Sequence, residues 1–321
     1  MFLALLQRSI CFSTIFLFGS VGETVTEKSG NLNLGIPGIM CMGGAGGVIG
    51  ATVYVNSVGV EGISAFGSVM LPLIFCLLMA ALGGLIYCFL TITLRCNQNV
   101  TGLALTTFGA GLVSFVGSRV TSQVPAGSLN RMSVFFTQSF PIGDSPNWFE
   151  TLFLSYGFLV YLAIILAIVV AIFIKKTRKG LNLRAVGENP ATADAAGISV
   201  TRYKYVATMI GSMIAGLGGL FYIMDFGGGN VEYDIEKFGW MAVALVIFTV
   251  WRPNWAILGS ILFGILYLMP NSIAVSFAEK EVIKMVPYLV TILVLVITSI
   301  VSRRESQPPA SLGLSYFREE R

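Results

Sequence analysis

The chain has 321 residues, of which 55% are hydrophobic and 11% are charged, and its formal net charge is +4. A soluble domain carries roughly a quarter charged residues, so this composition indicates an all-α polytopic membrane protein instead. The absence of histidine excludes a histidine-based metal site, catalytic triad or proton relay. The positive charge does not indicate nucleic-acid binding, because the lysines and arginines cluster at the ends of apolar runs.

Apolar runs that could each cross a bilayer, which takes about 20 residues, recur along the chain. They occupy residues 2–22, 34–55, 65–94, 100–117, 149–174, 205–224, 238–250, 255–269 and 285–301. The runs at 238–250 and 255–269 are shorter than a full span. Three arrangements are open for them: tilted helices, helices extended by the flanking polar residues, or broken helices that line a cavity. We therefore expect about nine transmembrane helices, in a range of eight to ten, within a transmembrane domain of residues 1–302. The polar tail, 303–321, is expected to be cytoplasmic and mobile.

The second run is rich in glycine. Small residues four apart occur twice in it, at Gly43 with Gly47 and at Gly46 with Gly50. This spacing predicts a helix face that touches the backbone of a neighbouring helix in the membrane.

The distribution of lysine and arginine predicts the orientation of the chain. Seven of these 20 residues lie in the polar segment 175–204. If that segment is placed inside and the runs alternate, only six basic residues lie outside, namely Arg8, Arg119, Arg131, Lys237, Lys280 and Lys284. The N-terminus is then outside and the C-terminus cytoplasmic. The stretches 119–148 and 225–236 face outwards.

The segment 175–204 contains a compact helix signal. Asn189 can accept a hydrogen bond as the N-cap, Pro190 suits the first helical position, and Gly197 ends the helix. An ordinary cytoplasmic loop is the alternative, but the caps favour a short rigid helix that docks a soluble partner.

Ionisable side chains are almost absent from the interiors of the apolar runs, and Glu23 is placed at a helix end. This argues against proton coupling and against a charged solute held within the membrane. The chain also lacks a Walker-type G-x-x-x-x-G-K-[ST] motif, so it carries no cofactor of its own. If ATP drives transport, the ATP and magnesium bind to a partner subunit.

Uncharged polar side chains near the breaks between apolar runs are candidates for a solute path. These are Asn31, Asn33, Gln98, Asn99, Thr101, Thr106 and Thr107. The alternative is that the asparagines are turn residues beside Gly30 and that the threonine hydroxyls bond their own helix.

The motifs in these segments resemble those of a known family. The runs from Gly187 to Pro190 and from Ala193 to Ile198 are similar to the coupling loop of ABC importer permeases. The branch is that of branched-chain amino acids, simple sugars and nucleosides. The run from Thr26 to Ile36 resembles its E-R/K-S-G-x-x-N-x-G-x entry.

Four further stretches, 97–105, 241–248, 251–253 and 263–264, resemble nucleoside-type permeases in particular. The resemblance covers roughly residues 10–300. Two positions depart from it, with Pro37 where glutamate is frequent and Thr106 where asparagine is common.

The resemblance implies a subunit of an ATP-driven importer in the cytoplasmic membrane of a prokaryote, which moves a neutral polar solute such as a nucleoside. It implies cytoplasmic ATP-binding subunits, a second permease subunit that is a paralogue, and an extracytoplasmic solute-binding protein received by the outward loops. The contacts with the ATPase would come from Gly187, Glu188, Asn189, Pro190, Ala193, Asp194, Ala196 and Gly197.

Three alternatives remain open at this point. The solute could be a simple sugar or riboflavin. The chain could be an ion-coupled secondary carrier, although its charge-poor runs count against this. A membrane-embedded enzyme would need catalytic residues or metal ligands within the runs, and we find none.

Overall fold

The computed structural model describes residues 2–140, 147–231, 234–272, 276–301 and 307–317, and these are folded as helices and connecting segments. Seven helical segments in this part of the chain are long and apolar enough to cross a membrane. Their helices are α1 (Phe2–Glu27), α2 (Ile36–Val58), α3 (Ala65–Cys88), α4 (Gln98–Phe115), α7 (Phe158–Lys176), α10 (Val200–Phe221) and α12 (Pro253–Ser272). A π-helical turn extends three of them, η1 (Phe89–Thr93) after α3, η2 (Val116–Val120) after α4 and η4 (Tyr222–Phe226) after α10.

The remaining helices are shorter. They are α5 (Ser128–Thr137), α6 (Trp148–Phe153), α8 (Arg178–Glu188), α9 (Pro190–Ala195), α11 (Ile235–Phe248), α13 (Phe277–Lys284) and α14 (Val286–Val301), with a single turn η3 (Thr121–Gln123). The structure confirms an all-helical protein with several spans. The expected runs at 238–250 and 285–301 correspond to α11 and α14, of 14 and 16 residues. Nine crossings and the placement of the termini across the membrane therefore stay predictions.

Two expected boundaries were wrong. The first helix continues to Glu27, so Glu23 lies more than one turn before its end. The fifth run is interrupted, because residues 149–153 belong to α6 and α7 begins only after Gly157.

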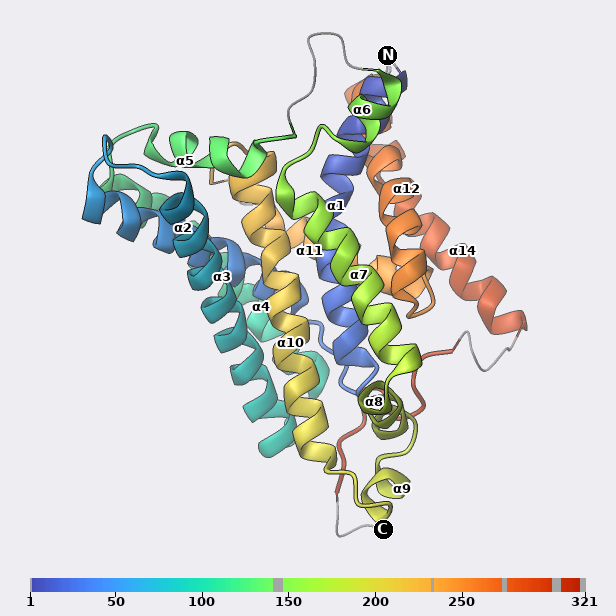
Figure 1. Cartoon of the computed structure of the whole chain (residues 1–321). Helices are drawn as coiled ribbons and strands as arrows, with labels where there is room; N and C mark the ends of the chain where they lie inside the picture. Colours follow the sequence, from blue (N-terminus) through green and yellow to red (C-terminus); the bar gives the residue numbers. More distant parts are fainter. Residues whose placement is uncertain (1, 141–146, 232–233, 273–275, 302–306, 318–321) are drawn as a thin grey trace.

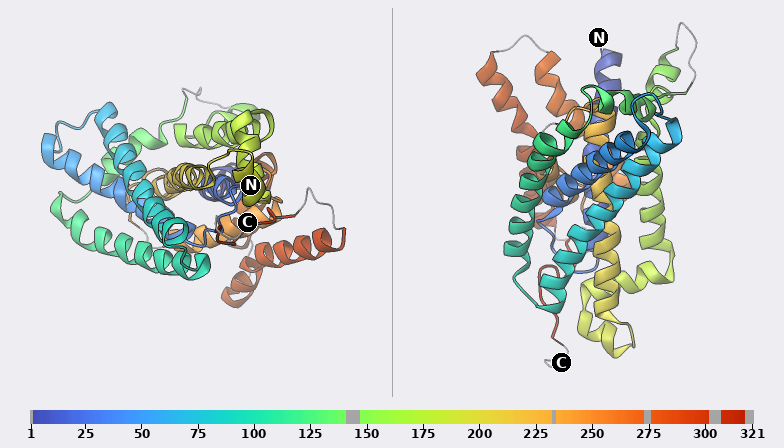
Figure 2. Two further views of the ribbon diagram at one scale, coloured as in Figure 1. Left: turned by 90° about the horizontal axis from the view of Figure 1, so that it is seen from below. Right: turned by 90° about the vertical axis from the view of Figure 1, so that its left-hand side faces the viewer.

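The helices form an inner group and an outer group. The inner helices α1, α2 and α10 pack against one another, and most of their apolar windows are buried. The outer helices α3, α4 and α7 leave large apolar side chains exposed, such as Leu78, Phe108 and Ile165. Figures 1 and 2 show the resulting bundle, with α14 at one side. An apolar outer surface is what lipid contact requires.

The glycines of α2 serve two different neighbours. A Cβ atom added at Gly43 would lie 2.4 Å from Cα of Gly216 in α10. A Cβ atom added at Gly46 would lie 2.6 Å from the carbonyl oxygen of Phe75 in α3. The predicted backbone contact is confirmed, and the two spaced pairs place α2 between α3 and α10.

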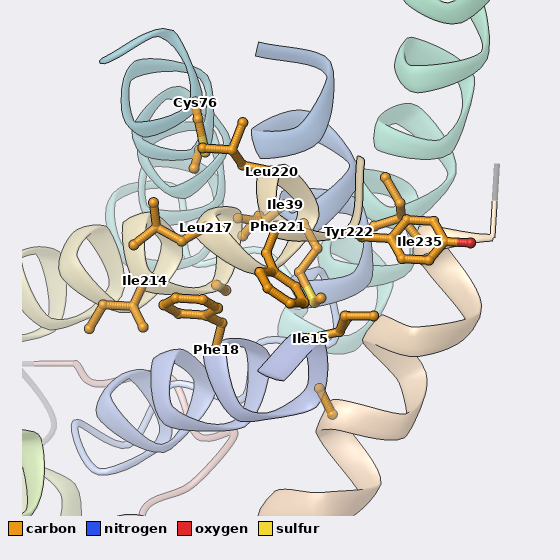
Figure 3. Close-up of a cluster of buried hydrophobic side chains, with 14 of the residues drawn as sticks. Ile15, Phe18, Ile39, Cys76, Ile214, Leu217, Leu220, Phe221, Tyr222 and Ile235 are labelled. Carbon is orange, nitrogen blue, oxygen red and sulfur yellow. The ribbon is translucent and has the colours of Figure 1, made fainter. Parts of the chain in front are cut away.

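Interlocked aliphatic and aromatic side chains fill the space around this contact. Figure 3 shows Ile15 and Phe18 of α1 facing Ile214 and Phe221 of α10, all of them buried. Leu220 points from α10 toward α3, next to Cys76. The core therefore centres on α10, with α1 on one side of it and α2 and α3 on the other.

The two ends of the bundle differ in structure. The short helices α8 and α9 lie at one end, and α5 lies at the opposite end (Figure 1). There the side-chain nitrogen of Asn130 donates to the carbonyl oxygen of Gly228 at 2.7 Å, which joins α5 to the segment after η4. The two stretches predicted to face outwards are thus in contact with each other.

We expect Gly43→Val to destabilise the protein, because the added side chain would collide with the backbone of α10. Overpacking of this kind costs about 1–3 kcal/mol. The measurement is thermal unfolding in detergent. Gly111→Val in α4 is the control, since a Cβ atom there has nothing within 4 Å. Equal melting temperatures for the two variants would contradict the assigned packing.

Candidate functional site

The segment after α7 forms a pair of short helices. The side-chain oxygen of Thr177 accepts the N–H of Gly180 at 3.0 Å and so caps α8. This helix was not predicted, because its three cationic residues and two glycines obscure the helix pattern in the sequence. The basic segment is therefore ordered along most of its length.

The predicted short helix is confirmed as α9. The side-chain oxygen of Asn189 accepts the N–H of Thr192 at 3.0 Å, and Pro190 occupies the first position. At the other end, the N–H of Ile198 bonds the carbonyl of Ala193, and Gly197 has a φ of +81°. This closing pattern needs a left-handed residue, which glycine supplies without strain.

The residues predicted to contact an ATPase divide by burial. Glu188, Asn189, Ala196 and Gly197 are exposed. Pro190 and Asp194 are half-buried, whereas Gly187 and Ala193 are buried. A buried position attaches α8 and α9 to the bundle, and an exposed position is free to meet a partner.

Gly187 attaches the helix pair to the loop after α1. A Cβ atom at Gly187 would lie 2.4 Å from the carbonyl oxygen of Lys28. Burial lowers the pKa of Lys28, against the opposing influence of nearby Glu188 and Glu27. The predicted coupling segment and the loop at 28–35 are therefore in direct backbone contact.

Residues 307–317, the described part of the tail that was expected to be mobile, are bonded to the bundle. Residues 307–317 lie along the same end of the bundle, and we term them the C-terminal strap. Ser311 donates from its N–H to the carbonyl of Gly187 at 3.0 Å, and Gly313 donates to the carbonyl of Gly30 at 3.1 Å. Tyr316 donates to Asp194 at 2.8 Å. For residues 307–317 the expectation was wrong, because these backbone and side-chain bonds join the strap to α9 and to the loop after α1.

The expectation that ionisable side chains are almost absent from the spans was also wrong. Glu23 and Glu27 are both buried in α1 and lie one turn apart. Glu23 accepts the N–H of Asn33 at 3.1 Å, and Glu27 accepts the indole N–H of Trp251. Asp225 in η4 is buried as well. The sequence signal that could have found the pair is the i, i+4 spacing of two glutamates before the Lys28 break.

The predicted path residues lie partly together. The N–H of Leu32 donates to the side-chain oxygen of Gln98 at 2.8 Å, and Thr106 donates to the carbonyl of Leu34 at 2.9 Å. Both bonds tie the loop at 31–35 to α4. Asn31 donates to Thr208 of α10 at 3.1 Å.

The other path residues are placed differently. Asn33 accepts the N–H of Gly35 at 3.0 Å, as a turn residue does. Thr101 donates to the carbonyl of Asn97, within the start of its own helix. Thr107 likewise bonds its own helix, and Asn99 is exposed.

Two residues of the predicted path and one of the predicted coupling segment share a cavity. Asn31, Gln98 and Asp194 line a polar cavity of about 330 Å³ at the α9 end of the bundle. The predicted path and the predicted coupling helix thus meet at one place in the fold.

Comparison with known proteins decides the family. The sequence model of one protein family, described as the permease component of the branched-chain amino acid transport system, matches residues 5–295 of this chain. The chain belongs to this permease family. It is a multi-pass protein of the cytoplasmic membrane, and the resemblance seen in its motifs is confirmed.

Individual relatives cover almost the whole chain. One is TsgC13 of Haloferax volcanii, named as a candidate glucose ABC transporter permease, which is 32% identical over 98% of both chains. The nucleoside ABC transporter permease NupC of Lactococcus lactis is 30% identical over 91% of this chain and 90% of its own. The guanosine ABC transporter permease NupQ of Bacillus subtilis is 26% identical over 99% and 97%. This permease is thus similar to sugar and to nucleoside permeases.

We expect Trp251→Phe to destabilise the permease, because it removes the N–H donor from the buried carboxyl group of Glu27. A buried acceptor without its partner costs about 1–3 kcal/mol. Thermal unfolding in detergent measures the change, with Trp255→Phe as the control because Trp255 is 57% exposed. A melting temperature no lower than that of the control would show that the bond contributes nothing.

Proposed function

We propose that this chain is the membrane permease subunit of an ATP-driven importer that moves a neutral polar solute, with nucleosides as the preferred class. The observation that carries the proposal is the similarity, over nine-tenths or more of both chains, to permeases named for nucleosides and guanosine. ATP and magnesium would bind to cytoplasmic partner subunits.

The end of the bundle with α9 is the proposed docking surface for the ATPase. Its exposed residues Glu188, Asn189 and Ala196 flank α9, a short helix that is capped at both ends. A rigid helix can transmit a displacement that a loose loop would absorb. The backbone contact of Gly187 with Lys28 leads from this surface to the loop that carries Asn31.

The opposite end is the proposed receiving surface for an extracytoplasmic solute-binding protein. A cavity of about 280 Å³ lies there, lined by the start of α5 and the segment 229–231. Asn130 and Asn230 are among its lining residues. Amide groups at such a surface can form the polar contacts of a transient complex. A second permease subunit, a paralogue of this one, would complete the membrane part.

The nature of the solute follows from the uncharged side chains of the proposed path. Amides and hydroxyls, such as those of Asn31, Gln98 and Thr106, can pair with the hydroxyl and carbonyl groups of a nucleoside. A sugar is the second candidate, because the Haloferax relative is named for glucose. The buried carboxyl groups of α1 weaken the earlier argument against an ion-coupled carrier, and membership of the permease family takes its place.

Uptake by the complete complex in liposomes, with solute-binding protein and ATP, tests the solute class. We expect ATP-dependent uptake of labelled uridine, which unlabelled guanosine reduces and glucose does not. Asn31→Leu and Gln98→Leu should each lower uptake by about 5- to 150-fold with normal insertion, since an unpaired buried polar group costs about 1–3 kcal/mol. Asn99→Leu is the control and should transport as wild type does, because Asn99 is exposed. Competition by glucose alone would favour the sugar as the solute. Wild-type uptake in both Asn31→Leu and Gln98→Leu would exclude the proposed path.

The coupling role of α9 has its own test. Gly197→Val should lose solute-stimulated ATP hydrolysis while keeping the bound ATPase, because valine at a φ of +81° costs about 1–2 kcal/mol and distorts the helix exit. Gly59→Val is a matched control, since Gly59 also has a positive φ, +71°, and open space around it. If Gly197→Val hydrolyses ATP in response to loaded binding protein as Gly59→Val does, α9 is not the coupling element.

A further inference from the structure

The cavity of about 330 Å³ at the α9 end has a chemistry that a neutral solute does not require. Its wall is formed by the start of α10, by η1 and the turn before α4, by the loop after α1 and by the C-terminal strap. Two cations, Lys204 and Arg95, line it together with the carboxylate of Asp194.

Neither cation is neutralised within the part of the chain that the structure describes. Lys204 is 3% exposed and lies in the second turn of α10, yet it takes part in no salt bridge among those residues. Arg95 stacks over the ring of Phe317 at 4.5 Å and has no carboxylate partner there. The carboxylate of Asp194 accepts the hydroxyl of Tyr316. A buried ammonium group without a counterion is costly, and an anionic ligand would remove that cost.

The N-terminus of α10 adds a third positive feature to the same wall. This helix has 22 residues, Ser199 forms no side-chain cap, and the first turn contains no acidic residue. The first-turn N–H groups and the helix dipole favour an anion at this position. Ser199, Val200 and Thr201 all line the cavity.

A buried acceptor in the same wall lacks a partner. The side-chain nitrogen of Asn31 donates to Thr208, but its oxygen has no hydrogen bond. A ligand that carries a hydroxyl group could satisfy this oxygen.

We propose that this cavity binds a phosphorylated small molecule from the cytoplasm, namely the phosphate ester of a nucleoside or sugar. The phosphate would contact Lys204, Arg95 and the first turn of α10, and a hydroxyl group of the ligand would donate to Asn31. The choice of nucleoside or sugar rests on the proposed function, because a kinase that consumes the imported solute would make such an ester. Because Asp194 lines the same cavity and belongs to α9, the bound ligand would lie next to α9.

Binding to the purified transporter complex in detergent tests the proposal by calorimetry. The probes are uridine 5′-monophosphate and glucose 6-phosphate, compared with uridine, glucose and inorganic phosphate. We expect at least one ester to bind more tightly than its parent and than inorganic phosphate. Lys204→Gln and Arg95→Gln should each weaken that binding by about tenfold or more, as expected for the loss of a charge-assisted bond. Arg95 is exposed, so its replacement should leave the fold intact. Lys176→Gln, which changes an exposed lysine outside the cavity, should bind as wild type does.

Three results would overturn the proposal. These are no binding of either ester to the wild type, unchanged binding in both Lys204→Gln and Arg95→Gln, or inorganic phosphate binding as tightly as the esters. A variant that ends at Phe317 lacks Glu319 and Glu320 and tests the chain's own carboxylates as the occupant. Ester binding that appears only in this variant would also overturn the proposal. Because these measurements need no uptake, failure of the site and failure of the import function are distinguishable.

Discussion

At Gly43 the backbone of α2 lies against that of α10, and at Gly46 and Gly50 it lies against α3. Lipid provides no hydrophobic force between apolar helices, so close backbone packing has to hold these three together. A bulkier residue at any of these glycines would separate the helices on which the rest of the bundle is packed. The start of α2 is fixed in the same way, because a Cβ atom at Gly239 of α11 would lie 2.4 Å from Cα of Pro37. Pro37, which departs from the family pattern, is therefore a packing residue in this fold.

Once α2 is fixed, the loop that precedes it becomes a junction of several elements. Its residues bond α1 through Glu23, α4 through Gln98 and α10 through Thr208. The C-terminal strap bonds Gly30, and α8 contacts Lys28 through Gly187. A contiguous chain of backbone contacts and hydrogen bonds thus leads from α9 to the proposed path, which is the kind of network that can carry mechanical coupling.

The amino-acid sequence predicts this fold well where one local rule decides the structure. Apolar run length located the long helices, the spacing of small residues located the α2 contacts, and cap residues located α9 at its first residue. The failures arise where distant segments decide. The tail is polar and contains Pro308 and Pro309, and no local pattern shows the bonds that join its strap to Gly187, Gly30 and Asp194. Glu23 was placed at a helix end because the polar residues after it suggested a stop, whereas burial against Asn33 and Trp251 lets the helix continue through Glu27.

The short helix α11 shows how backbone strain and burial compensate each other. Its turn into α12 contains two consecutive non-glycine residues with positive φ, Val250 at 54° and Trp251 at 53°. Such a conformation costs about 1–2 kcal/mol per residue. In return, the N–H groups of Val250, Trp251 and Arg252 all bond carbonyl groups of the preceding turn, and the Trp251 indole reaches the buried Glu27. Because Trp251 is only 7% exposed, an extended loop here would leave backbone groups without water or protein partners. The tight left-handed turn therefore lets a 14-residue helix end inside the bundle, and it anchors the α11–α12 pair to the end of α1.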